Sequence, residues 1–414
     1  MDSLKNKIYR LLRKSEKYTN TDMVYLAKGG FWLTFNRIIG IIVAFVLAIV
    51  YANWLPKESY GTYKYILSIA AFFSIAALPG MNTSINRAAA IGKDGLFLEG
   101  VKSKVKWGVI GSLAGVALAA YYFFQDNYLL AFGFLVAALI APISDSLAYG
   151  PYLEGKKLFK TSSIYSAVSQ PLIAAALITT LFFTKNIAIF VLVYFFSNFL
   201  VKLILFFYTL KKYPPNKEKD LEMISLGKGL SAINLLSTGA EQLDKILMWH
   251  FLGAAELAIY SFSLLPANNV ISFLKMIPII AFPKLANQSP KEIKQNLPKK
   301  FLKFYLLIIV LIIIYLILAP YFYQIFFPEY LASLKYALVF SLSILFFPQR
   351  MIAQLLIVHA SKKDLYLFQT LAPIIRISFL TILLPLYGIW GAIAALLFSN
   401  FSEAVLLYYF FKKL

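Results

Sequence analysis

Long apolar runs of about twenty residues alternate along the chain with short polar or charged stretches. A helix needs roughly 20 mostly apolar residues to cross a hydrocarbon core about 30 Å thick. The runs are continuous and lack the period-two alternation of transmembrane β-strands, so they predict helices. Twelve spans are expected: Phe31–Asn53, Tyr63–Asn86, Trp107–Phe124, Leu129–Tyr149, Ile164–Phe183, Ile187–Leu210, Leu226–Phe251, Leu257–Phe282, Phe301–Ala319, Leu334–His359, Leu365–Leu384 and Ile389–Phe411.

The composition supports a polytopic membrane protein and excludes a soluble one. Hydrophobic residues make up 60% of the 414 residues, and charged residues only 14%. A soluble domain has about 45–50% apolar and about 25% charged residues, because its surface must be polar. The chain has no cysteine and two histidines, which excludes disulfides, cysteine-ligated metals and a histidine-rich metal site. We therefore expect no metal and no cofactor.

The positive charges that give the chain its net charge of +21 are distributed unevenly between the two predicted sides of the membrane. Most lysines and arginines fall in the segments on one predicted side of the membrane, whereas only Lys57 and Lys185 are clearly assigned to the other side. By the positive-inside rule, both termini are cytoplasmic, as an even number of spans also demands. We expect a multi-pass protein of the cell membrane that contacts anionic lipids and does not bind nucleic acid.

The first 28 residues form a basic segment without the apolar stretch of a signal peptide. Leu4, Ile8, Leu11 and Leu12 share one helical face among Lys and Arg residues. The segment is therefore either an amphipathic helix on the inner leaflet or a basic tail.

An internal repeat divides the spans into two halves. Trp54–Tyr63 aligns with Phe251–Tyr260 at an offset of about 197 residues, and two further short matches follow at similar offsets: Gly155-Lys156-Lys157 with Ser361-Lys362-Lys363, and Phe196–Phe199 with Phe398–Phe401. Six spans per half give both repeats the same orientation, so we expect two lobes around a pseudo-twofold axis with a cavity between them at the midplane. The expected division is a basic cytoplasmic segment (1–28), an N-lobe (29–212), a cytoplasmic linker (213–224) and a C-lobe (225–414).

Several short motifs resemble the polysaccharide-transporter branch of the multidrug/oligosaccharidyl-lipid/polysaccharide exporter superfamily, which includes the O-antigen flippases. They are Lys28-Gly29-Gly30-Phe31-Trp32, Leu55–Tyr63, Asp244–Leu247, Leu252-Gly253, Ile259-Tyr260, Phe282–Leu285 and Tyr387–Ala392. One departure is Ala258, where many relatives have glycine. The resemblance covers essentially the whole chain and implies an all-α, MATE-like fold.

The resemblance also implies a function. The leading hypothesis is a flippase that moves a polyprenyl-pyrophosphate-linked oligosaccharide from the inner to the outer leaflet by alternating access. The alternative is a multidrug exporter of the same fold, whose usual cationic cargo a positive cavity would repel. A membrane polymerase or glycosyltransferase is less favoured, because no loop is long enough to hold a catalytic site and no Ser/His/Asp set or phosphate-cradling glycine loop is present. We expect a transporter and not an enzyme.

Arginine is rare in this lysine-rich chain, and four of its six arginines lie in or at the ends of spans. A charge at bilayer depth is costly and indicates function, and arginine grips phosphate oxygens with a planar fork. Arg37, Arg350 and Arg376 are expected to line a cationic cavity for the pyrophosphate; the alternative is that each pairs with a buried carboxylate or caps the inner end of a helix. Arg87 and Lys275 are further candidates, although capping of a helix end for Arg87 and snorkelling for Lys275 and Lys202 are the alternatives.

The carboxylates within the spans are fewer. Asp244, with Asn400 and Glu403, is a candidate site for Na⁺ or H⁺ that would couple transport to an ion gradient. Glu241 and Lys245 lie one helical turn apart and are expected to pair. We expect Asp145 to pair with an arginine of the N-lobe. We expect His250 and His359, at the ends of spans, to lie at the membrane–water interface.

Overall fold

The computed structural model describes residues 23–275, 290–349, 353 and 362–413. Over these residues the chain is entirely helical outside its turns. The elements are α2 (Met23–Trp54), α3 (Lys57–Ile75), α4 (Met81–Ala90), α5 (Leu96–Phe124), α6 (Tyr128–Ser146), α7 (Tyr149–Gly155), α8 (Phe159–Phe183), α9 (Ile187–Lys212), α10 (Glu222–Leu252), α11 (Ala254–Leu274), α13 (Pro290–Phe326), the 3₁₀ turn η1 (Pro328–Ser333), α14 (Leu334–Phe340), the 3₁₀ turn η2 (Ser341–Phe346) and α16 (Lys362–Lys413).

Within the described residues, nine helices are long and apolar enough to cross a membrane. Two predicted spans belong to one of these nine, because α16 folds back on itself at Gly388, whose φ of 58° is accessible mainly to glycine. The predicted spans beginning at Tyr63 and Leu226 correspond to α3 and α10, which are less apolar and are not among the nine. The predicted all-α polytopic fold is confirmed.

The predicted span Tyr63–Asn86 is broken in the structure. Helix α3 ends at Ile75, and α4 begins at Met81. Leu78 has a positive φ of 53° and precedes Pro79, which disfavours helical geometry in the residue before it. The backbone N–H of Gly80 then donates to Ser231 Oγ of α10 at 3.0 Å, so the break is stabilised by a hydrogen bond to the next helix in space.

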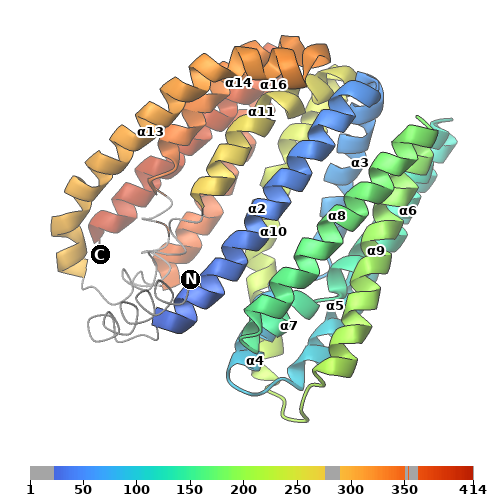
Figure 1. The fold of residues 1–414 in the computed structure, drawn as a ribbon, viewed down its shortest axis with the longest axis vertical. Helices are drawn as coiled ribbons and strands as arrows, with labels where there is room; N and C mark the ends of the chain where they lie inside the picture. Colours follow the sequence, from blue (N-terminus) through green and yellow to red (C-terminus); the bar gives the residue numbers. More distant parts are fainter. Residues whose placement is uncertain (1–22, 276–289, 350–352, 354–361, 414) are drawn as a thin grey trace, which may run out of the picture.

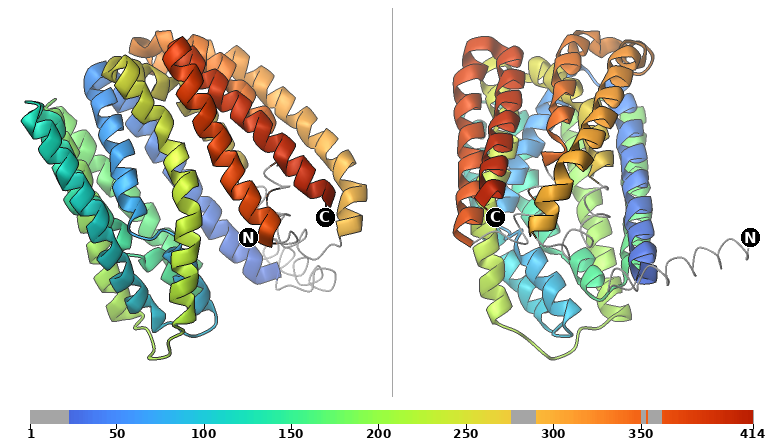
Figure 2. Two further views of the ribbon diagram at one scale, coloured as in Figure 1. Left: turned by 180° about the vertical axis from the view of Figure 1, so that it is seen from behind. Right: turned by 90° about the vertical axis from the view of Figure 1, so that its left-hand side faces the viewer.

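The helices form two groups that meet at one end and diverge at the other (Figures 1 and 2). Helices α5–α9 lie in one group, and α13, α14 and α16 lie in the other, with α2, α3, α10 and α11 between them. We call the end with the α2–α3 and α10–α11 turns, around residues 55 and 253, the closed end. The opposite end, where α2 begins and α16 finishes, is the open end.

The closed end is sealed by backbone and aromatic contacts between α3, α11 and η1. Gly61 packs so closely on α11 that a Cβ atom there would lie 1.8 Å from the carbonyl oxygen of Ala254. The ring of Phe262 lies 4.8 Å from that of Tyr60 and 3.9 Å from that of Tyr330 between centroids. All three rings are fully buried. These tightly packed aromatic rings exclude water from this end.

The linker after α9 is bound to the open end of the first helix group. Asn216 Nδ2 donates to the carbonyl of Gly92 at 2.6 Å, and its Oδ1 accepts from the Gly95 N–H at 3.1 Å. Lys93 Nζ donates to Asp220 at 2.8 Å, and this bond holds the pKa of Asp220 below its ordinary value. The division into lobes at residues 213–224 stays a prediction, but the linker residues are hydrogen-bonded to the turn between α4 and α5.

Candidate functional site

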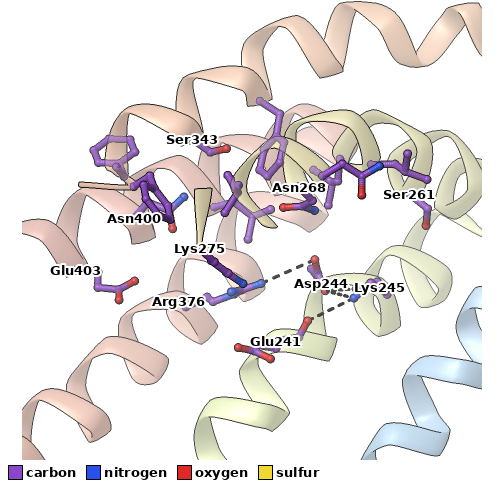
Figure 3. Close-up of a pocket in the computed structure, with 18 of the residues that line it drawn as sticks. Glu241, Asp244, Lys245, Ser261, Asn268, Lys275, Ser343, Arg376, Asn400 and Glu403 are labelled. Carbon is purple, nitrogen blue, oxygen red and sulfur yellow. Dashed lines mark hydrogen bonds and ion pairs between the residues drawn. The ribbon is translucent and has the colours of Figure 1, made fainter. Parts of the chain in front are cut away.

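A cavity of about 480 Å³ lies between α3, α10, α11, the α14–η2 segment and α16 (Figure 3). We call it the charged chamber, because seven ionisable residues of the described part of the chain line it. They are Lys64, Glu241, Asp244, Lys245, Lys275, Arg376 and Glu403. The chamber extends into a smaller space of about 220 Å³ between α10 and α16, which Glu241, Arg376 and Glu403 also line.

Asp244 is the most buried charge of the chamber, with 2% of its surface exposed. Its Oδ2 accepts a hydrogen bond of 2.7 Å from the hydroxyl of Tyr260, and its Oδ1 accepts one of 2.8 Å from the backbone N–H of Lys245. Two cations lie slightly farther away: Lys245 Nζ at 3.7 Å from Oδ1 and Arg376 Nη2 at 3.9 Å from Oδ2. A buried carboxylate requires such compensation, because an unpaired charge is costly at low dielectric.

Arg376 on α16 is held loosely by this arrangement. Figure 3 shows its guanidinium pointing toward Asp244, with Lys275 beside it. The 3.9 Å separation is an ion pair without a hydrogen bond, since hydrogen bonds between charged groups measure about 2.7–2.9 Å. The Nε atom of Arg376 is buried and has no hydrogen-bond partner among the described residues. Part of the fork of Arg376 therefore remains available to a ligand.

Other polar atoms of the chamber are also without partners in the described part of the chain. Ser261 Oγ and Ser343 Oγ are buried without a hydrogen bond. Buried polar atoms are nearly always paired with protein or ordered water, so orphan atoms around a cavity indicate where a polar ligand or water binds. The charged chamber thus offers cations and unused hydroxyl groups together.

The structure brings five of the predicted site residues together in this chamber. Arg376 and Lys275, predicted for the substrate, line it together with Asp244, Asn400 and Glu403, predicted for a coupling ion. The two predicted groups therefore share one cavity. In particular, Arg376 and Asp244 contact each other directly.

The other predicted arginines lie elsewhere. Arg37 on α2 and Arg87 on α4 are exposed and are not among the residues that line the charged chamber. Arg350 and His359 lie outside the described residues. His250 is exposed at the end of α10 beside Phe251, as expected of an interfacial residue.

Two predicted ion pairs are wrong. Lys245 Nζ contacts the Asp244 carboxylate and the backbone carbonyl of Glu241 at 3.5 Å, and no Glu241 carboxylate contact is found in the described structure. The Asp244 side chain folds back onto its own backbone, which brings it within reach of the flexible lysine. Asp145 pairs with Lys202 at 2.9 Å and not with an arginine, so Lys202 does not simply snorkel.

Sequence reasoning missed Lys64, which also lines the chamber. The internal repeat contained a signal for it: at the offset of about 197 residues that aligns Tyr63 with Tyr260, Lys64 aligns with Ser261, and both residues line the chamber. Equivalent positions of two pseudo-symmetric lobes face the same central space.

A second cavity of about 340 Å³ adjoins the charged chamber and is lined by α2, α3, α8, α9 and α11. We call it the tyrosine chamber, because Tyr51, Tyr60, Tyr63 and Tyr194 line it. Lys64, Leu265 and Asn269 line both chambers, which makes the two spaces continuous.

Comparison with solved structures identifies the fold. A MATE transporter in complex with MaD5 matches with a TM-score of 0.64 and 12% identity, covering 93% of this chain and 95% of that chain. The lipid II flippase MurJ matches with a TM-score of 0.62 and 12% identity, covering 92% of this chain and 87% of that chain. A third match is a MOP superfamily transporter from Pyrococcus furiosus, described as having a binding pocket of reversed polarity. Its TM-score is 0.62 and its sequence identity 11%, and the match covers 93% of this chain and 95% of that chain.

No curated protein sequence matches the chain. The sequence profile of a family described as "Polysaccharide biosynthesis protein" matches residues 26–289, which is more than half of the chain. The chain therefore belongs to the polysaccharide biosynthesis protein family, and its fold is similar to that of a MATE transporter and of the flippase MurJ.

Proposed function

We propose that the protein flips a polyprenyl-pyrophosphate-linked oligosaccharide, such as an O-antigen-type repeat unit, from the inner to the outer leaflet by alternating access. The observation that carries this proposal is the charged chamber, whose lining includes three buried polar atoms without a hydrogen-bond partner among the described residues: Arg376 Nε, Ser261 Oγ and Ser343 Oγ. An anionic head group would satisfy the Nε of Arg376, whose fork suits phosphate oxygens.

The charge of the chamber fits an anion better than a cation. Of the residues that the structure describes, four cationic ones, Lys64, Lys245, Lys275 and Arg376, line it against three carboxylates. The most buried carboxylate, Asp244, already has two cationic neighbours and two hydrogen-bond donors. A pyrophosphate diester would therefore meet a net attraction, whereas a cationic drug, the cargo of the alternative exporter, would have to displace these partners. In this proposal the substrate crosses without chemical conversion.

The predicted coupling ion belongs to the same proposal. A Na⁺ or H⁺ at Asp244, with Asn400 and Glu403 nearby, would compete with Arg376 for the Asp244 carboxylate. Binding of a phosphate by Arg376 would relieve this competition. Anion and cation would then bind the chamber together, and Asp244 would join the two events.

The expected orientation places the open end in the cytoplasm of the cell and the closed end outside. The basic linker residues lie at the open end, together with the first residues of α2 and the last of α16. In this orientation the structure corresponds to an inward-facing state, ready to receive a substrate from the inner leaflet, where anionic lipids contact the basic surface.

The orientation is testable because the chain has no native cysteine. We expect Lys217→Cys, in the linker, to be protected from an impermeant thiol reagent in intact cells, and Gln125→Cys, between α5 and α6, to be labelled. Labelling of both in lysed cells controls for accessibility. The reverse pattern in intact cells would invert the orientation.

The substrate class is tested by binding of geranylgeranyl pyrophosphate to the purified protein. Arg376→Ala should weaken binding by roughly ten- to hundredfold, since a charge-assisted contact contributes about 1.5–3 kcal/mol. Arg376→Lys keeps the charge but loses the fork, so it should weaken binding less.

Lys335→Ala is the matched control, because Lys335 is an exposed cation of α14 near the closed end. Equal binding by wild type and Arg376→Ala would refute the proposal. Transport of the cation ethidium, abolished by substitution of the chamber carboxylates, would instead support the multidrug exporter.

A further inference from the structure

The tyrosine chamber differs chemically from the charged chamber beside it. Among the residues that the structure describes, no aspartate or glutamate lines it, and Lys64, at the boundary of the two chambers, is the one lysine or arginine in its lining. Its other polar residues are tyrosines and the amides Gln170, Asn198 and Asn269. Its volume of about 340 Å³ falls in the range of about 300–1,000 Å³ typical of small-molecule sites. The chamber therefore suits a ligand that is polar but uncharged.

The amides around this chamber have unused hydrogen-bonding capacity. Asn198 Nδ2 donates to the carbonyl of Tyr194 at 2.8 Å, which leaves Asn198 Oδ1 available to accept. The side chain of Asn269 has no hydrogen bond in the described part of the chain. Gln170 Nε2 makes one long contact of 3.4 Å with Asn36 Oδ1. An amide both donates and accepts, as does a sugar hydroxyl, so these side chains match a surface of several hydroxyls.

The tyrosine rings supply the complementary apolar surface. The rings of Tyr63 and Tyr194 meet edge to face with centroids 5.4 Å apart, and both residues line the chamber. Tyr194 is half-buried, whereas Tyr51, Tyr60 and Tyr63 are nearly fully buried. A tyrosine combines an apolar face with a polar hydroxyl. A pyranose has the same combination, with C–H bonds on its faces and hydroxyls around its rim.

We propose that the tyrosine chamber is a saccharide subsite, which binds the first neutral sugar residues of the substrate while the charged chamber binds its pyrophosphate. This inference rests on the proposed function. Lys64 and Asn269, which line both chambers, lie where the sugar–phosphate linkage would pass. The substrate class is accordingly a lipid pyrophosphate whose proximal sugars are uncharged.

The test compares two kinds of probe on the purified full-length protein: geranylgeranyl pyrophosphate, and the same lipid pyrophosphate bearing a neutral disaccharide (chitobiose, lactose or isomaltose). We expect wild type to bind at least one glycosylated probe about tenfold more tightly than the bare pyrophosphate. The double variant Gln170→Met with Asn198→Leu should abolish this advantage and leave the affinity for the bare pyrophosphate within twofold of wild type.

Ser197→Ala is the matched control, because Ser197 neighbours Asn198 on α9 but does not line the chamber. It should keep the full advantage of the glycosylated probe. The proposal is overturned if no disaccharide adds affinity in wild type, or if the double variant weakens both probes equally. Failure of the proposed function has a different signature, namely no binding of either probe or no effect of Arg376→Ala.

Discussion

Two clusters of charged side chains, one in each group of helices, differ in how completely their polar atoms are paired. In the first group, Lys202 Nζ contacts Asp145 at 2.9 Å, and the buried Lys104 donates to Asn82 Oδ1 at 2.9 Å. In the charged chamber, Arg376 lies 3.9 Å from Asp244 and has an orphan Nε.

Cavity size does not distinguish the two clusters. The cavity around Asp145 and Lys202 measures about 500 Å³, and the charged chamber measures about 480 Å³. The difference lies in hydrogen-bond satisfaction: Lys202 and Lys104 of the first cluster each donate a hydrogen bond of 2.9 Å, whereas the Arg376 Nε of the second has no partner among the described residues. A fully paired polar network holds a structure together, and an incompletely paired one is where a ligand gains free energy. This difference favours a structural role for the first cluster and supports the proposed ligand-binding role of the second.

The largest effect that would sharpen this comparison is expected from Asp244→Asn. The amide keeps a hydrogen bond to Tyr260 but removes the negative charge that competes for Arg376. Gradient-driven transport of geranylgeranyl pyrophosphate in proteoliposomes should fall at least tenfold, while binding of this probe should be unchanged or up to about tenfold tighter. Glu329→Gln, at an exposed carboxylate of η1, is the control. Undiminished transport by Asp244→Asn would remove Asp244 from the mechanism.

A smaller effect, of a different kind, is expected from Lys202→Ala. Loss of the 2.9 Å ion pair leaves Asp145 without its cation, so the melting temperature in detergent should fall by a few degrees. Probe affinity should stay within twofold of wild type. The charge-neutral pair Lys202→Met with Asp145→Asn should recover part of the lost stability. Weaker binding at an unchanged melting temperature would break the comparison and give this cluster a role in transport.

The smallest effect concerns the linker and pH. The hydrogen bond from Lys93 lowers the pKa of Asp220 in the linker. The bond therefore stabilises the contact between the linker and the α4–α5 turn at pH values above about 3.9, the pKa of an unfolded aspartate. This stabilisation is lost as the pH falls through the lower pKa that Asp220 has in the folded protein. A spin label at Lys217→Cys should therefore gain modest mobility only below about pH 4. With Asp220→Asn, the label should be mobile at neutral pH already. The same acid transition in that variant would exclude Asp220 as its source.

Much of the fold could be predicted from the sequence, because the bilayer imposes a simple rule on apolar length. Residues 388 and 253 illustrate this: both turns fall between predicted spans, and both glycines have positive φ. The break at Leu78–Pro79 was missed, because an apolar run reads as continuous even where its backbone turns. Two spans, α3 and α10, are central helices that contribute Lys64, Glu241, Asp244 and Lys245 to the chamber, so their composition is less apolar than their position suggests.

The site was predicted in part. Depth in a span identified Arg376, Lys275, Asp244, Asn400 and Glu403, because ionisable groups there must face a cavity or a partner. Depth does not reveal which face of a helix a residue occupies, and Arg37 is exposed on α2 outside the charged chamber.

Pairing was harder to predict than position. The one-turn spacing of Glu241 and Lys245 suggested the wrong partner, since the carboxylate of Asp244 accepts from the backbone N–H of Lys245 and thereby approaches its ammonium group. The bond from Tyr260 to Asp244 joins two helices across the turn at Gly253, and helical spacing alone contains no information about it.

The aromatic seal at the closed end has a thermal consequence. Opening that end exposes the rings of Tyr60, Phe262 and Tyr330 to water, so the change carries a positive heat capacity. Apolar association weakens on cooling, whereas hydrogen bonds such as those of the linker have no such dependence on apolar hydration. In the proposed alternating-access cycle, cooling would therefore favour the state that is open at this end, and temperature alone would be a means of populating it.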